Sequence, residues 1–235
     1  MKIERLLQSQ GFGTRRECRT LVRAGVVEIG QRVVDDPFEE VVAEGLEFIV
    51  DGEIWTYRER AYLMLHKPLG YECSRISQHH RSVFELLPPQ LMQRGVQPVG
   101  RLDVETTGLL LLSDDGQFIH AWSSAKKGIP KCYEVQAKHA VSAAMLTALR
   151  EGVQLRDEPT PIAARSCELR SERELSLVVN EGRYHQVRRM VAAAGNRAEG
   201  LHRTTIGGLE LPEDLSPGEW RWLGEEDIER LAGFD

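Results

Sequence analysis

Long hydrophobic runs and closely spaced cysteines are both absent from this chain of 235 residues. No apolar stretch approaches the roughly 20 residues that cross a bilayer, and the charged residues 1–5 do not resemble a signal peptide. The four cysteines, Cys18, Cys73, Cys132 and Cys167, lie far apart, which excludes a CxxC zinc site and a readable disulfide framework. With 41% apolar and 28% charged residues, we expect a folded, soluble, cytoplasmic protein without a membrane partner.

Motifs for cofactors are missing as well. The sequence contains no phosphate-binding loop, no dinucleotide fingerprint and no cluster of metal ligands. His79 and His80 are the nearest to a metal pair, but adjacent side chains chelate poorly, and we interpret them as part of a loop.

The charge is distributed unevenly along the chain. The net charge is −6, yet residues 204–235 alone carry nine acidic residues against Arg221 and Arg230. Residues 1–32 contain seven basic and three acidic residues, and residues 183–203 contain five arginines and only Glu199. These two basic segments indicate either nucleic-acid contacts or solvated helices, because binding depends on the local field and not on the total charge.

The first 55 residues have the pattern of a compact helical module followed by a hairpin. Thr14 and Glu17 match a capping box, and Gly25 is a typical C-terminal cap for the helix that follows them. This helix combines an apolar face with a basic stripe formed by Arg15, Arg16, Arg19 and Arg23. A hairpin around residues 30–31 and a strand at 46–50, ending at an Asp-Gly turn, are expected next.

This order of elements resembles the S4 RNA-binding domain. The resemblance implies a structured RNA as the partner but does not specify a reaction. We therefore predict an S4 module of the αL type at residues 1–57 and a larger domain at residues 61–235.

The larger part of the chain predicts a mixed α+β fold. Strand-like runs occur at residues 62–65, 109–112, 132–137, 162–167 and 175–179. Helical spacing occurs at residues 141–151 and 184–194, each followed by glycine. The order lacks the regular βαβ repeat of a doubly wound sheet.

Asp103 is the first candidate for chemistry. It follows a Gly-Arg-Leu turn and precedes a Thr-Thr-Gly connection into the apolar run at 109–112. A loop held by rigid elements is a favoured place for catalytic groups. The alternative is a turn or a helix cap, which aspartate also favours.

Two further segments carry reactive side chains. Lys131 and Tyr133 are expected on one face of a strand, where a ring and an ammonium can bind a nucleotide; a structural tyrosine with a snorkelling lysine is the alternative. His185, Arg188 and Arg189 are expected on one side of a helix, where they form either a phosphate-binding edge or a solvated surface.

Together these segments resemble the three signature motifs of the pseudouridine synthases. The matching residues are 100–103, the pair Lys131 and Tyr133, and the run 181–190, with further matches at 64–71 and 201–209. The similarity is greatest to the branch typified by the ribosomal small subunit pseudouridine synthase A. It implies a mixed, mainly antiparallel sheet with flanking helices, and an isomerisation of uridine that needs no cofactor.

The resemblance also implies roles for individual residues. Asp103 would act as an ionised carboxylate, by attack on the sugar, by attack on the base, or by removal of a sugar proton. Arg188 would keep Asp103 ionised, and Tyr133 would stack on the uracil and take the C5 proton. Arg101 would fill the space that the extruded base leaves. The remaining candidates for RNA contact are Lys131, Arg183, His185, Arg189 and the pocket residue Leu201.

The substrate implied by the resemblance is a uridine in 16S ribosomal RNA, either in free RNA or in an assembly intermediate. Residues 183–186 and the pair Thr106 and Thr107 are typical of the small-subunit branch. A synthase for 23S ribosomal or transfer RNA is one alternative, and a non-catalytic RNA-binding or ribosome-assembly protein is another. The family analogy implies a monomer.

Overall fold

The computed structural model describes residues 1–234, which form two compact units. The first unit comprises Met1–Tyr62 together with Leu87–Gln97 and Ser113–Asp115, and the second contains the rest of the chain. The boundary predicted from the sequence, between residues 57 and 61, stays a prediction. No helix within residues 1–234 is long and apolar enough to span a membrane.

The N-terminal module begins with two short helices, α1 (Ile3–Ser9) and α2 (Arg15–Arg23). Thr14 accepts a hydrogen bond from the Glu17 amide, and Glu17 accepts one from the Thr14 amide, so the predicted capping box is confirmed. Cys18 and Val22 of α2 are buried against α1, whereas Arg15, Arg16 and Arg23 are exposed.

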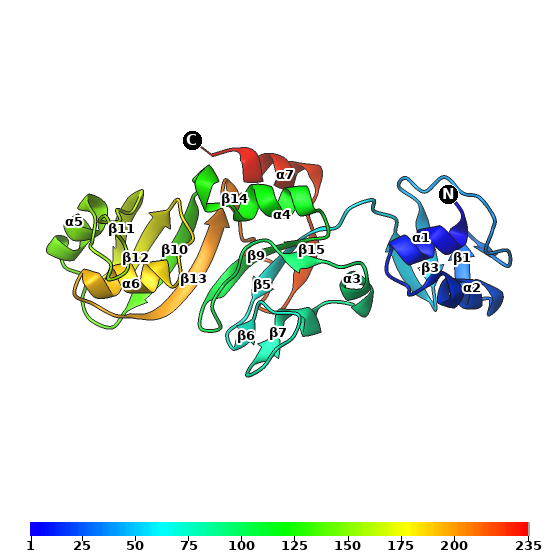
Figure 1. Ribbon diagram of the computed structural model, residues 1–235, viewed down its shortest axis with the longest axis horizontal. Helices are drawn as coiled ribbons and strands as arrows, with labels where there is room; N and C mark the ends of the chain where they lie inside the picture. The colour runs from blue at the N-terminus through cyan, green and yellow to red at the C-terminus, as the bar shows by residue number, and fades with distance from the viewer. Residues whose placement is uncertain (235) are drawn as a thin grey trace. The chain divides into compact units, whose positions relative to one another are not determined.

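A four-stranded sheet completes this module; it lies beside α1 and α2 in Figure 1. Its order is β2 (Arg32–Val33), β1 (Val27–Ile29), β3 (Glu47–Val50) and β4 (Glu53–Thr56). The predicted hairpin around Gly30 and the Asp-Gly turn after β3 are both confirmed. Asp51 and Gly52 have φ angles of 52° and 81°, as the tight turn of a two-residue hairpin requires.

Within the first unit, a buried polar network joins the end of α1 to the segments Leu87–Gln97 and Ser113–Asp115. Arg94, just after α3 (Pro89–Gln93), lies 2.8 Å from the Asp114 carboxylate and donates a 2.8 Å hydrogen bond to Gln10. Gly11, at φ 90°, passes so close to this helix that a Cβ would lie 2.0 Å from the Gln90 carbonyl oxygen. Only glycine fits this approach.

The second unit contains a nine-stranded mixed sheet. In order its main strands are β11 (Ser166–Ser171), β12 (Glu174–Val179), β10 (Lys131–Ala137), β13 (Ala198–Ile206), β9 (Thr107–Ser113), β5 (Tyr62–Lys67) and β15 (Trp220–Trp222). Two short strands, β14 (Leu209–Glu210) and β8 (Gln97–Pro98), pair with β13 and β9. The pair β13–β9 is parallel, whereas β11, β12, β10 and β13 are joined in antiparallel fashion.

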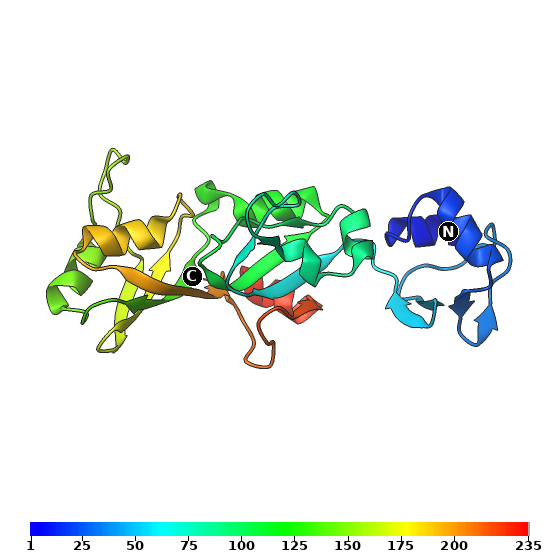
Figure 2. The ribbon, with the colours of Figure 1, turned by 90° about the horizontal axis from the view of Figure 1, so that it is seen from below.

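Helices and short connections surround this sheet. The helices are α4 (Gly116–Ser123), α5 (Ala143–Glu151), α6 (Gln186–Ala193) and α7 (Glu225–Ala232). Two 3₁₀ turns, η1 (Val83–Leu86) and η2 (Ala125–Lys127), and a parallel pair of β6 (Tyr71–Glu72) with β7 (Arg81–Ser82) complete the unit. Helix α6 lies alongside β13 in both ribbon views (Figures 1 and 2).

Three predicted elements of the second unit begin later than predicted: the helix at 141–151 begins at Ala143, and the other two have an identifiable cause. The expected strand at 162–167 begins only at Ser166, because Ile162 pairs with Val153 in an isolated bridge. The expected helix at 184–194 begins at Gln186, because His185 has a left-handed backbone at φ 47°. A left-handed residue cannot continue a right-handed helix.

Candidate active site

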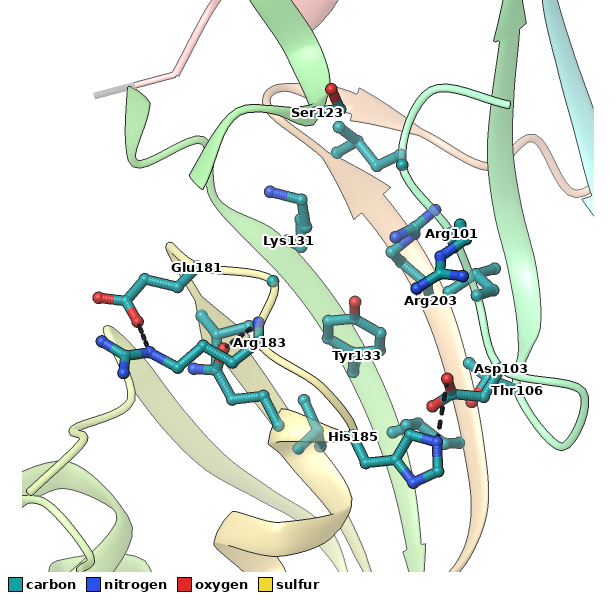
Figure 3. A pocket seen from close by; sticks show the side chains of 18 of the residues that line it. Arg101, Asp103, Thr106, Ser123, Lys131, Tyr133, Glu181, Arg183, His185 and Arg203 are labelled. Carbon is teal, nitrogen blue, oxygen red and sulfur yellow. Dashed lines mark hydrogen bonds and ion pairs between the residues drawn. The ribbon is translucent and has the colours of Figure 1, made fainter. Parts of the chain in front are cut away.

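A cavity of about 310 Å³ lies where three segments of the second unit meet (Figure 3). The loop at 99–106, one face of β10 with its neighbour β13, and residues 181–187 supply its walls. The predicted residues found in its lining are Arg101, Asp103, Lys131, Tyr133, Arg183, His185 and Leu201. The sequence motifs that lie far apart along the chain therefore converge in space.

Asp103 lies at the edge of this cavity, in a turn closed by a 3.0 Å hydrogen bond from the Thr106 amide to the Asp103 carbonyl. One oxygen of its carboxylate is 3.3 Å from Nε2 of His185, as Figure 3 shows. In the described part of the chain the carboxylate caps no helix. The left-handed backbone of His185 is uncommon for a residue other than glycine, and the imidazole at this position is the near neighbour of the carboxylate.

The carbonyl groups that follow Asp103 are held by two cations. Lys67, fully buried, donates hydrogen bonds to the carbonyls of Val104 at 3.4 Å and Thr106 at 2.8 Å. Arg188 donates a 2.9 Å hydrogen bond to the carbonyl of Glu105, between them. We call this arrangement the carbonyl clamp. It fixes the loop that carries the carboxylate from two sides.

Lys67 is unusual because a lysine side chain is rarely fully buried. Burial lowers the pKa of its ammonium group to about 8, and the charge of Arg203 adds to this shift, whereas the charge of Asp103 opposes it. Lys67 was not predicted as a functional residue; its signal in the sequence is a lysine two residues after the apolar pair Met64 and Leu65, within the matching segment 64–71.

Arg188 does not form the predicted ion pair with Asp103. Its guanidinium donates to the carbonyls of Ala198 and Glu105, both at 2.9 Å, and lies 3.8 Å from the Glu105 carboxylate. The group that lies beside the Asp103 carboxylate is instead the His185 imidazole, whose Nε2 is 3.3 Å from it.

The other basic residues near α6 do not form the expected common edge. Arg183 is paired with Glu181 and Glu158. Arg189 donates to the Tyr184 carbonyl at 3.3 Å and lies 3.7 Å from Asp157. Since His185 precedes the helix, its side chain does not share the helical face on which we expected all three.

Lys131 and Tyr133 lie on one face of β10, as predicted, and both are buried. The Lys131 ammonium donates a 2.8 Å hydrogen bond to the Ile129 carbonyl. Burial, together with the charge of Arg203, lowers its pKa to about 8. Lys131 is thus not a snorkelling lysine: its charged end is enclosed beside the cavity.

Arg203 of β13 is a second residue that the sequence analysis did not single out. It is 3% exposed, pairs in register with Tyr133, lines the cavity and donates through Nε to the Leu109 carbonyl at 2.8 Å. One of its terminal nitrogens has no hydrogen-bond partner within residues 1–234. Gly108 allows the strands to approach here, because a Cβ on it would lie 2.2 Å from the Arg203 carbonyl oxygen.

Two other predicted residues occupy different depths of the cavity. Arg101 is exposed and lines the cavity. Leu201 is buried and also lines it, and it pairs in register with Val135 of β10.

The four arginines of α2 belong to the N-terminal module and are not equivalent. Arg19 forms an ion pair with Glu4 and lies over the Phe38 ring at 5.1 Å. Arg15 donates to the Gln8 side chain at 3.1 Å. Arg16 and Arg23 are exposed.

Comparison with known proteins identifies this arrangement. The model of the RNA pseudouridylate synthase family matches residues 61–193. The chain belongs to this family. The synthase is 37% identical to the uncharacterized RNA pseudouridine synthase YtzG of Bacillus subtilis, over 98% of each chain. It is also 37% identical to the ribosomal small subunit pseudouridine synthase A of Vibrio vulnificus, over 98% of this chain and 99% of that protein.

A solved structure agrees with these relatives. The crystal structure of a pseudouridylate synthase matches with a TM-score of 0.69 and 34% identity, covering 98% of this chain and 99% of that one. The predictions of an RNA pseudouridine synthase and of its mixed-sheet fold are therefore confirmed. The S4 assignment of residues 1–57 stays a prediction.

Proposed function

We propose that this synthase converts a uridine of 16S ribosomal RNA to pseudouridine, as a monomer. Several relatives are named ribosomal small subunit pseudouridine synthase A, and residues 183–186 have the sequence Arg-Tyr-His-Gln that favours this branch. The observation that carries the proposed reaction is that Asp103 and Tyr133 line the same cavity.

The reaction conserves every atom of the uridine. The bond from N1 to the sugar C1′ breaks, a bond from C5 to C1′ forms, C5 loses a proton and N1 gains one. No electron or group donor is required, so the groups needed are a carboxylate, a proton acceptor and a surface that holds the detached ring. A stacked base is out of reach of these groups, so the nucleotide is extruded, at a cost of a few kcal/mol.

Each cavity residue has a place in this reaction. Asp103 acts as the ionised carboxylate, and Tyr133 stacks on the uracil and accepts the C5 proton. Leu201 packs against the ring beside Tyr133, and Arg101, exposed at the cavity, fills the space that the base leaves. Lys131 and Arg203 both line the cavity and supply it with positive charge.

Positioning of Asp103 depends on the carbonyl clamp. Lys67 and Arg188 fix three successive carbonyls directly after it, so Arg188 acts on Asp103 through the loop and not by an ion pair. The His185 imidazole is the near neighbour of the carboxylate, with Nε2 at 3.3 Å. A fixed carboxylate can direct its attack, since misplacement by about 1 Å can cost 10²-fold in rate.

The N-terminal module contributes binding energy. We assign it as an S4 domain that contacts phosphates of the ribosomal RNA through Arg15, Arg16, Arg19 and Arg23. In the catalytic unit, the residues proposed to contact the RNA are Arg183, His185 and Arg189. Phosphate contacts position the RNA without reading its sequence, and their energy offsets the cost of extruding the base.

Substitution of Asp103→Asn tests the catalytic assignment. The amide keeps the shape of the carboxylate but cannot be ionised, so tritium release from 5-tritiated uridine in a 16S transcript should disappear. Asp157→Asn, which removes an exposed carboxylate outside the cavity, is the matched control and should keep the wild-type rate. A surviving rate in Asp103→Asn would contradict the role of Asp103.

Mapping pseudouridine in RNA from cells that lack the protein tests the substrate. The proposal expects one 16S position to lose the modification and to regain it when the gene is returned. Loss at a 23S or transfer RNA position would reassign the substrate. Unchanged RNA, together with RNA binding by the purified protein, would favour a non-catalytic binding protein.

A further inference from the structure

A second hollow of about 440 Å³ adjoins the catalytic cavity. The two share a wall that consists of Arg101, Leu102, Asp103, Tyr184 and His185. The second hollow continues past this wall to Cys73 and Arg188. Because the wall includes the candidate catalytic carboxylate, a nucleotide next to a uridine bound in the cavity would be close to this hollow.

Tyr184 gives the shared wall a flat aromatic surface. The residue is 74% exposed, and its ring stacks on the His185 ring with centroids 4.0 Å apart and planes inclined by 14°. The His185 ring is in turn 3.3 Å from Asp103. One face of the tyrosine is therefore supported from behind, while most of the side chain faces solvent.

Folding does not account for the position of this ring. An exposed tyrosine buries little apolar surface, and its backbone carbonyl, not its ring, receives the contact from Arg189. Exposed aromatic rings are the surfaces on which proteins stack unpaired bases, because every base presents a π face. Arg101 and Arg188 add positive charge to the hollow, although Glu105 lies 3.8 Å from Arg188.

We propose that this second hollow binds the base of a nucleotide that flanks the target uridine, with Tyr184 as its stacking surface. The proposal rests on the proposed function for the presence of RNA in the cavity, and it adds a subsite that reads the neighbourhood of the uridine. Tyr184 is a binding residue and takes no part in the bond changes.

Kinetics with altered protein and altered RNA test this subsite. The substrate is a short RNA around the mapped pseudouridine position, made intact and with a single abasic nucleotide at each of the neighbouring positions. For Tyr184→Ala we expect KM to rise about tenfold while kcat stays within twofold, and Tyr184→Phe and Tyr184→Trp to stay within threefold of wild type. At one flanking position the abasic change should weaken the wild-type enzyme about tenfold and leave Tyr184→Ala unaffected.

Several outcomes would overturn the subsite. Wild-type KM in Tyr184→Ala, or an equal loss with every abasic RNA, would mean that no flanking base stacks there. A fall in kcat at unchanged KM would mean that Tyr184 only supports His185. Leu169→Ala, which removes an exposed apolar side chain of β11 outside both hollows, is the control for general surface effects.

Failure of the proposed function gives a different result. If the modified uridine lies in another RNA, the same comparison is made on that RNA, and the subsite stands or falls on the pairing between Tyr184 and one flanking base. If the wild-type protein modifies no RNA, no position can be mapped; binding is then compared for wild type and Tyr184→Ala, using single-stranded oligonucleotides that contain one uridine and are either intact or abasic beside it.

Discussion

Two sets of cations in this molecule are held in opposite ways. In the N-terminal module, Arg16 and Arg23 are exposed on α2, where solvent and salt screen them. In the catalytic unit, Lys67, Lys131 and Arg203 are buried, and each donates to a backbone carbonyl. Desolvation makes a buried charge costly, so burying these three cations lowers the free energy of unfolding.

The comparison separates two uses of positive charge. Under the proposed function, we expect the exposed arginines to supply a field that attracts RNA at a distance and weakens with salt. The buried cations act over a few ångströms on the loop and the cavity wall, where screening is small. Altering each set should therefore change different measurable quantities.

The largest effect is expected from Lys67→Met, which removes one side of the carbonyl clamp. The carbonyls of Val104 and Thr106 lose their donor, and the Asp103 loop can shift, so kcat should fall about 10²-fold. KM for RNA should stay within threefold, since Lys67 is fully buried and does not reach the RNA. Single-turnover rates at saturating RNA measure this.

Lys67→Arg is the control for that change. It keeps a permanent charge and several donors at the same place, and it should restore part of the lost rate. If Lys67→Met retained a rate within threefold of wild type, the loop would be fixed by other contacts, and the clamp would have no catalytic effect.

A change in stability with pH should follow from Lys131→Met. Below about pH 8 the lysine is charged in both the folded and the unfolded chain, so its burial cost is fully present. As the pH rises from about 8 towards 10.5, which is the ordinary pKa of lysine, the folded chain loses the proton first and the cost of burial disappears. The variant should therefore be more stable than wild type at pH 7, by about 1–3 kcal/mol.

Denaturant unfolding of both proteins at several pH values checks this expectation. The stability advantage of Lys131→Met should shrink steadily between pH 8 and pH 10. An advantage that is constant with pH would show that the lysine does not change its protonation in this range.

The smallest effect is expected from the exposed arginines. Arg16→Ala with Arg23→Ala should weaken RNA binding about tenfold at low salt, and the slope of log K against log salt should decrease by about one to two units. The rate at saturating RNA should stay unchanged. Titrations at several salt concentrations provide the slope.

Arg15→Ala with Arg19→Ala provides the matched comparison within the same helix. Arg19 is already paired with Glu4, and Arg15 donates to Gln8, so this double variant should change the slope less. An equal change in both double variants would mean that the RNA displaces the internal partners.

Local patterns in the sequence predicted those features that depend on local physics. The capping box at Thr14 and the turn at Asp51 each depend only on residues close in the sequence. The same is true of the alternation that places Lys131 and Tyr133 on one face of a strand. The convergence of the three motifs was predicted by family resemblance, since spacing alone left Asp103 open to interpretation as a cap.

Features set by tertiary contacts were not predictable in this way. Helical periodicity extended the helix through His185, because a single left-handed residue leaves no periodic signal. The contacts of Arg188 depend on the position of Glu105, 83 residues away. Lys67 and Arg203 were missed because their burial arises from the pairing of distant strands, which composition does not reveal.

The carbonyl clamp has a consequence for how the protein and its RNA substrate adapt to each other. With three consecutive peptide oxygens tied down, the carboxylate has little freedom to seek its target. The nucleic acid must then undergo most of the rearrangement. We therefore expect an RNA that bends or unpairs easily around its uridine to be a better substrate than a stiff RNA that makes the same contacts. The enzyme would then distinguish between RNAs by their flexibility.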